Sequence, residues 1–320
     1  MSFSIKLNKS NSSSFRVSPT NSSTTYTLTL PGITLSLRLK KSKKKSIDVP
    51  YKDGASYKPA NNIDISKLQP LAYANYISKI SNLIKLNRLT NLLIPSLLLS
   101  LLAYGLMDLI ETLPTNLRIM TSLLLFFIGL IGLILKIYLH TIGRLQYKQL
   151  SNHKELPSIW KRLSSSDKLW YIEGIYVLDE NASKENGGIN ITYERIPVKI
   201  RHKAPFYLHT NSKVMQVKLD DYTLLILPEH YIITKKSDVG IDNNSNIAIT
   251  SEAKPYAELE LEVIPRDTEV LYKTWKYVNK DGSKDKRYKK NEQIPICNYG
   301  LVSLESDTGS KIVFLSSNNE

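Results

Sequence analysis

The sequence predicts an α+β membrane protein, in which a two-helix transmembrane hairpin is joined to a mainly-β cytosolic C-terminal domain. Two uncharged apolar runs, residues 89–107 and 119–135, each have about the 17 to 25 residues that a helix needs to cross a bilayer. Beyond residue 170, short segments rich in Val, Ile, Tyr and Thr alternate with turn-forming pieces such as ENGG, DNNSN and KDGS. The apolar runs carry no polar stripe, which argues against two amphipathic helices of a soluble core.

The first 40 residues predict a small β-hairpin module. Tyr26, Leu28 and Leu30 alternate with Thr, and a similar alternation follows the turn expected at Pro31 and Gly32. The stretch TYTLTLPGITLSLRLK resembles the C-terminal half of a short bacterial domain of unknown function that stands at the N-terminus of many membrane proteins. The resemblance implies a fold and no activity.

The following segments lead to the membrane and back. Residues 41–69 are rich in Lys, Ser, Pro and Asn and predict a basic flexible linker. Residues 70–88, with Ile77, Ile80 and Ile84 at helical spacing, predict a helix on the membrane surface. We expect transmembrane helices over residues 89–112 and 118–140, an external turn over 113–117 and a helical connector over 141–169.

The distribution of charge predicts the orientation of the hairpin. The first 88 residues hold 15 basic and 3 acidic side chains, and Lys136, Arg144 and Lys148 follow the second apolar run. The positive-inside tendency therefore places both termini in the cytoplasm of a bacterial inner membrane. We find no signal peptide before the hairpin, and the single Cys297 agrees with cytosolic soluble parts.

The net charge of +14 does not indicate a nucleic-acid-binding protein, because residues 151–320 hold 24 basic and 24 acidic side chains. The excess lies in the N-terminal part, where a dense cluster is predicted to contact anionic lipid at about 1 kcal/mol per residue. A solvated linker is the alternative interpretation. The cluster consists of Lys40, Lys41, Lys43, Lys44 and Lys45.

Residues 170–320 predict a β-sandwich, a small barrel or a related β-domain. The segment PFYLHTNSKVMQVKLDDYTLLILPEHYIIT resembles the strands of pleckstrin-homology-like bacterial domains, with their Leu-Pro-Glu turn at residues 227–229. The segment TWKYVNKDGSKDKRYKKNEQIPICNYG resembles a motif of uncharacterised bacterial two-span membrane proteins. Neither resemblance implies an established chemistry.

The sequence shows no active-site pattern, so we predict a protein that is not an enzyme and that needs no cofactor or metal. The five histidines share no metal-ligand spacing with one another or with Cys297. We find no Walker loop, nucleophile elbow or dinucleotide fingerprint. Cys297 lies in an apolar strand pattern that is typical of a buried packing residue, which we favour over a nucleophile paired with His230.

Two basic clusters are the candidate anion-binding residues. The first lies in the loop of residues 280–291, close to aromatic side chains, and its cations could hold phosphate groups of a lipid or a nucleotide. The second lies on a strand whose alternation puts its cations on one face. A solvated surface is the alternative for both, and only their convergence in space would make one site. The clusters are Lys280, Lys284, Lys286, Arg287, Lys289 and Lys290, and Lys199, Arg201 and Lys203.

Two functions fit these features. In the first, a non-enzymatic membrane protein binds an anionic lipid, a nucleotide or a partner through its β-domain and couples that state to the hairpin. This arrangement is similar in outline to effectors of bacterial anti-phage signalling. In the second, the protein is a membrane-anchored scaffold for a protein partner, without a small ligand. The sequence neither supports nor excludes a homo-oligomer. Gly129 and Gly132 are not at the four-residue spacing of the helix-dimer motif.

Overall fold

The computed structural model describes residues 2–7, 14–19, 23–30, 33–40, 54–100, 114–147, 156–210, 212–259 and 264–319, which belong to two compact units, residues 1–50 and 51–320. The first unit is an antiparallel sheet in the order β1-β4-β3-β2. Its strands are β1 (Ser2–Leu7), β2 (Ser14–Pro19), β3 (Ser23–Leu30) and β4 (Ile33–Lys40). Leu30 of β3 pairs with Ile33 of β4, which confirms the predicted hairpin; its turn, residues 31–32, lies outside the described residues.

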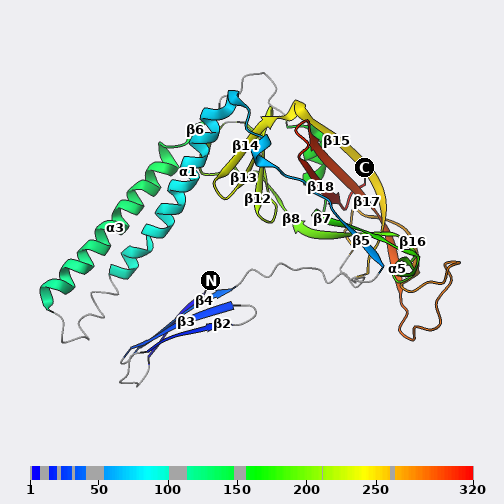
Figure 1. Ribbon diagram of the computed structural model, residues 1–320, viewed down its shortest axis with the longest axis horizontal. Helices are drawn as coiled ribbons and strands as arrows, with labels where there is room; N and C mark the ends of the chain where they lie inside the picture. Colours follow the sequence, from blue (N-terminus) through cyan, green and yellow to red (C-terminus); the bar gives the residue numbers. More distant parts are fainter. Residues whose placement is uncertain are drawn as a thin grey trace. The chain divides into compact units, whose positions relative to one another are not determined.

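The second unit contains the predicted mainly-β domain, built from two antiparallel sheets (Figure 1). The five-stranded sheet has the order β14-β13-β12-β11-β9, with β9 (Ile200–Arg201), β11 (Met215–Lys218), β12 (Tyr222–Ile226), β13 (His230–Lys235) and β14 (Asp238–Asn243). The seven-stranded sheet has the order β15-β17-β18-β7-β5, with β16 also paired to β17 and β8 to β7. Its strands are β5 (Ala55–Pro59), β7 (Leu169–Leu178), β8 (Ile191–Val198), β15 (Ile247–Ala257), β16 (Glu269–Trp275), β17 (Gln293–Ser306) and β18 (Lys311–Ser316).

Shorter elements connect these sheets. The helices α4 (Ser158–Ser165) and α5 (Glu180–Lys184) flank β7, and the short 3-10 helices are η1 (Ile65–Lys67), η2 (Leu71–Tyr73) and η3 (Asn244–Asn246). Two short strands, β6 (Leu145–Gln146) and β10 (Leu208–His209), form a parallel pair. Among its described residues, the predicted helical connector of residues 141–169 is helical at Thr141 and in α4, and it also contains β6, which pairs with β10 of the β-domain.

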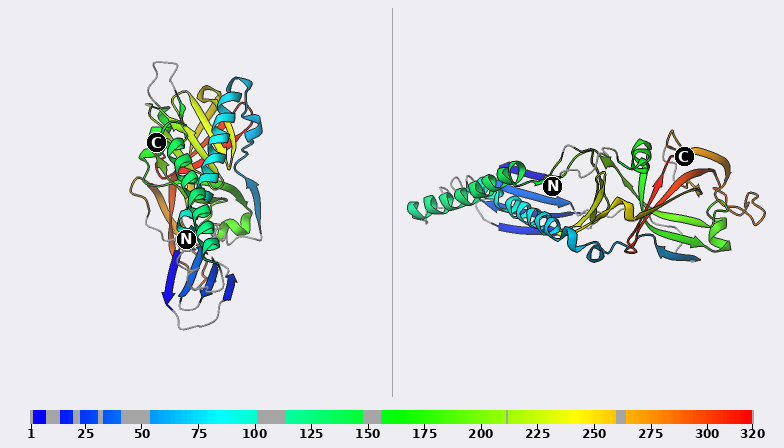
Figure 2. Two further views of the ribbon diagram at one scale, coloured as in Figure 1. Left: turned by 90° about the vertical axis from the view of Figure 1, so that its left-hand side faces the viewer. Right: turned by 90° about the horizontal axis from the view of Figure 1, so that it is seen from above.

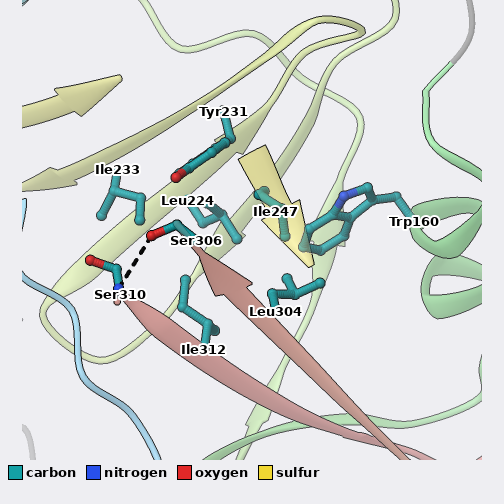
Figure 3. A pocket seen from close by; sticks show the side chains of 9 residues that line it. All are labelled: Trp160, Leu224, Tyr231, Ile233, Ile247, Leu304, Ser306, Ser310 and Ile312. Atoms are coloured by element: carbon teal, nitrogen blue, oxygen red, sulfur yellow. Dashed lines mark hydrogen bonds between the residues drawn. The ribbon is translucent and has the colours of Figure 1, made fainter. Parts of the chain in front are cut away.

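The two sheets pack face to face over an apolar core. Alternate residues of β12 and β13 face opposite sides, as the period of two in a strand requires. Leu224 and Ile233 contact the core between the sheets, whereas Leu225 and Ile232 belong to a second core on the outer face. A cavity of about 20 Å³ lies between the sheets beside Trp160 of α4 (Figure 3). Its size and apolar lining leave room for at most one water molecule, so it is not a ligand site.

A buried ion pair lies on the other face of the seven-stranded sheet, where β8 and β15 approach each other. Arg195 of β8 pairs with Glu258, and both side chains are almost fully buried. The guanidinium group lies 4.7 Å from the ring centre of Trp170 and 4.6 Å from that of Tyr256. Tyr299 donates a hydrogen bond of 2.9 Å to Glu258, and burial followed by Glu258 raises the pKa of Tyr299. Removing one partner of such a pair leaves an uncompensated buried charge, so the cluster stabilises the curved sheet only as a complete set.

Two packed helices extend away from the β-domain (Figures 1 and 2). These are α1 (Ala74–Leu93), with helical residues continuing over 95–100, and α3 (Thr115–Thr141). Among the described residues, α3 is the one helix long and apolar enough to cross a membrane. It matches the predicted span over 118–140. The predicted first span, over 89–112, lies partly outside the described residues, as does the start of the predicted external turn.

Close contacts hold the two helices together. Gly132 packs directly on Leu93, and a side chain added at Gly129 would collide with the backbone of Leu97. Ser96 donates a hydrogen bond of 3.0 Å to the carbonyl oxygen of Leu125, and Lys136 donates one of 2.8 Å to Asn91. The two helices therefore pack through small residues and interhelical hydrogen bonds, which is typical of helices in a bilayer.

The predicted surface helix of residues 70–88 is present as η2 and most of α1, but its apolar face contacts protein. Ile80 is fully buried, and Ile77 and Ile84 pack with it against the outer face of the five-stranded sheet. The pattern of an apolar stripe on one helix face is the same for a lipid surface and for a sheet, so the sequence alone does not separate these two partners.

The predicted flexible linker of residues 41–69 is wrong over its described part. β5 pairs with β7, and Asn62 bridges to Lys311. Ile65 and Leu68 are buried in the core between the sheets. Both lie against Gly240 of β14. Two apolar residues in a short segment are too few to show a helical or strand period in the sequence, so the segment has the composition of a linker.

Candidate functional site

The loop between β16 and β17 is internally hydrogen-bonded. Asn291 accepts a hydrogen bond of 3.0 Å from the backbone N–H of Tyr277 and donates one of 2.6 Å to its carbonyl oxygen, which closes the base of the loop. The rings of Tyr277 and Tyr288 stack with centres 3.8 Å apart. Asp285 is buried at the centre of the loop, where the bonds it accepts from Arg287 lower the pKa of its carboxyl group.

Half of the six candidate cations of this loop are occupied by other groups. Arg287 contacts Asp285 through two guanidinium nitrogens, at 2.6 and 3.0–3.1 Å. Lys284 lies 4.1 Å from the ring centre of Trp275, and the ammonium group of Lys280 lies 3.5 Å from Glu180. The other three are exposed and, within the described part of the chain, have no acidic partner within 4 Å: Lys286, Lys289 and Lys290. The loop therefore offers a local patch of positive charge made by three of its six cations.

The second basic cluster lies on another sheet. Lys199, Arg201 and Lys203 are exposed on and beside β9, the edge strand of the five-stranded sheet. The β16–β17 loop projects from the far end of the seven-stranded sheet (Figure 1). The structure thus does not bring the two clusters together, and the condition for one combined anion site is not met.

A basic groove opens beside the second cluster. Its volume is about 530 Å³, within the range of small-molecule sites. It is lined by α4, by the segment that follows β9 and by the segment before β11. Its lining includes two lysines and one histidine, and three residues that carry a hydroxyl group. The lining consists of Leu156, Lys161, Ser164, His202, Ala204, Thr210, Ser212, Lys213, Val214 and Met215.

The apolar wall of the groove belongs to the cluster at the base of the helix pair. Ala204 and Val214 line the groove and are part of the same apolar cluster as Ile80 of α1. Phe206, two residues beyond Ala204, stacks on His140 of α3 with ring centres 5.5 Å apart. A molecule in the groove would therefore contact two residues of the cluster that also includes the base of α1.

One further polar cluster lies at this base. The imidazole of His230 is hydrogen-bonded to Tyr73 at one nitrogen and to Tyr147 at the other. From the sequence, the one role we considered for His230 is a disfavoured nucleophile pair with Cys297. No sequence signal was available, because the three residues come from segments far apart in the chain. Cys297 itself is fully buried, and burial raises the pKa of its thiol, as expected of a packing residue.

The structure does not describe a site at the remaining predicted positions. Lys40 ends β4, and residues 41–45 of the predicted membrane-surface cluster lie outside the described residues. The described part of the chain contains no group of His, Cys, Asp or Glu that could hold a metal ion. No family model, curated protein or solved structure matches the chain.

Proposed function

We propose that the protein is a non-enzymatic integral membrane protein whose β-domain binds a phosphate-bearing ligand in the basic groove and passes the bound state to the helix pair. The observation that carries this proposal is that Ala204 and Val214 line the groove and also belong to the apolar cluster that contains Ile80 of α1. Lys161 and Lys213 place positive charge on the wall of the groove, and a charged donor makes stronger hydrogen bonds to phosphate than a neutral one.

The membrane assignment is supported by side chains that face outward from the helix pair. Large apolar residues are exposed on α3, among them Met120 at 68%, Leu124 at 61% and Ile134 at 56%. A surface of this kind is unfavourable in water and favourable in lipid. The charge distribution supports a two-span hairpin with both termini in the cytoplasm.

The test uses the full chain in nanodiscs of electrically neutral phosphatidylcholine, with inorganic pyrophosphate as the probe. The variant Lys161→Ser/Lys213→Ser should bind pyrophosphate at least tenfold more weakly than the parent in isothermal titration, because each charged contact contributes about 1.5 to 3 kcal/mol. The matched control Lys58→Ser/Lys218→Ser removes the same charge from exposed strand positions and should change the affinity less than twofold.

Equal weakening in both variants would show that pyrophosphate responds only to net charge, which contradicts a groove site. No binding by the parent at low ionic strength would favour the scaffold function. That function is supported by β16, which is paired on one side with β17 and exposes Val270, Leu271 and Tyr272. An exposed strand edge of this kind can accept a strand from a protein partner.

A further inference from the structure

The base of the helix pair holds the β-domain close to the proposed bilayer. Ile80 of α1 is fully buried against the outer face of the five-stranded sheet, and Leu89 begins the apolar run that we assign to the membrane. The stretch of helix between these two residues is about 14 Å long. Phe206 of the β-domain stacks on His140, the last residue of the predicted second span. The β-domain therefore cannot move far from the membrane surface.

The basic loop of residues 280–291 lies at the far end of a long hairpin that starts near this base. Ser306 of β17 lines the cavity between the two sheets, and Gln293 at the other end of the strand borders the loop. In Figure 1 the helix pair and the hairpin of β16 and β17 diverge from the region of β14, and both run towards the lower side of the view. The loop therefore lies on the side of the β-domain from which the helices extend.

The loop presents its exposed cations on an ordered frame. Asn291 closes the base of the loop, the rings of Tyr277 and Tyr288 stack, and Arg287 is held by Asp285. Such a frame loses little conformational freedom when it binds a partner. The three lysines beside these residues are exposed and have no acidic partner within 4 Å in the described part of the chain: Lys286, Lys289 and Lys290.

An anionic lipid surface is the partner that fits this patch. The ammonium group of a lysine is a point charge without a fixed binding angle, which suits phosphate groups that move within a membrane. Residues 280–291 hold six basic and two acidic side chains, and exposed lysines are attracted to anionic lipid close to the surface. A nucleic acid would be attracted by the same charges. The helix pair favours the lipid, because it keeps the loop and the membrane at a high effective concentration.

We propose that residues 286–290 dock on the anionic headgroups of the membrane that the helix pair spans, which gives the β-domain a second contact with the bilayer. The helices anchor the five-stranded sheet, and the loop holds the far end of the seven-stranded sheet. Anionic lipid thus fixes the orientation of the β-domain on the membrane. The inference rests on the membrane assignment of the proposed function and not on the groove.

The experiment places a nitroxide label at the start of the loop, as Lys280→Cys, in the full chain in nanodiscs. Lys280 is exposed, whereas Cys297 is fully buried and should stay unlabelled. A small share of the lipid carries a nickel-chelating headgroup, which shortens the relaxation time of a label close to the membrane. We expect strong relaxation in nanodiscs that contain phosphatidylglycerol and weak relaxation in phosphatidylcholine alone. Physiological salt should weaken the effect, since the screening length falls to about 8 Å.

The variant Lys286→Ser/Lys289→Ser/Lys290→Ser should lower the ratio of docked to undocked molecules by about a hundredfold at low ionic strength. Its label should then relax as weakly as in phosphatidylcholine alone. The matched control Lys199→Ser/Arg201→Ser/Lys203→Ser also removes three exposed cations, but from the edge strand β9 and the residues beside it. It should respond to phosphatidylglycerol like the parent, because charges beyond the screening length contribute little.

Three outcomes would overturn the docking. The first is equal relaxation of the parent label with and without phosphatidylglycerol. The second is an equal loss in both variants, which would show a response to net charge alone. The third is a loop that stays away from phosphatidylglycerol but binds double-stranded DNA through the same lysines, which would replace the lipid by a nucleic acid.

The test also separates this inference from the groove. The samples contain no pyrophosphate, so a groove that binds nothing leaves the relaxation of the label unchanged. A loop that does not dock leaves the affinity of the groove as measured in the titration. A chain that does not insert into nanodiscs would refute the membrane assignment and the docking together.

Discussion

The two basic regions of the β-domain differ in how they are built. The β16–β17 loop collects six cations in one short segment, but Asp285, Glu180 and Trp275 occupy three of them, and the rest are exposed. The groove draws Lys161, His202 and Lys213 from three separate segments around a volume of about 530 Å³. A cluster of charge in the sequence therefore need not form a concave site, whereas residues far apart in the sequence can line one.

Charge reversal gives the largest expected difference between the two regions. Lys213→Glu places a carboxylate in the groove and should weaken pyrophosphate binding by about tenfold to a hundredfold, since a charge-assisted contact is lost and a repulsive one is added. Lys289→Glu makes the same change on the loop and should alter the affinity by less than threefold. Isothermal titration at one fixed ionic strength checks both. The reverse ranking would place the anion site on the loop.

Releasing a cation on the loop gives a smaller expected effect. Asp285→Asn removes the carboxylate that holds Arg287 and raises the charge of the loop by one. We expect unchanged pyrophosphate affinity and a loss of about 1 to 3 kcal/mol of local stability, because the carboxyl group is buried and accepts charge-assisted hydrogen bonds. Amide exchange over residues 277–291 measures the stability. An increase in affinity would mean that Asp285 masks a functional loop.

Much of the fold could be predicted from the sequence because its signals are local. YTLLILP and HYIIT are short runs of apolar and β-branched residues, which favour strands, and both segments form strands of the five-stranded sheet. The apolar run of residues 119–135 lies within α3, which begins at Thr115 and ends at Thr141. The β-hairpin at Leu30 and Ile33 was likewise signalled by the turn residues between them.

The candidate sites could not be predicted in the same way. The groove depends on α4 lying beside the segments around His202 and Lys213, and the polar cluster at His230 depends on Tyr73 and Tyr147 reaching one histidine. Such contacts are set by tertiary packing between distant segments, and neither charge density nor periodicity records them. β5 could not be predicted for the same reason. It is a short strand that is defined by its pairing with β7, a segment more than 100 residues further along the chain, and its own composition predicts a linker.

Coupling between the groove and α1 is measured by amide exchange with and without pyrophosphate, in the full chain in phosphatidylcholine nanodiscs at pH 8. We expect pyrophosphate to slow exchange in residues 202–204 and 212–215, which contribute to the lining of the groove, and in residues 77–84, several of which belong to the apolar cluster of Ala204 and Val214. Exchange in residues 280–291 should not change. Protection confined to residues 280–291, or protection of the groove without any effect on residues 77–84, would contradict it.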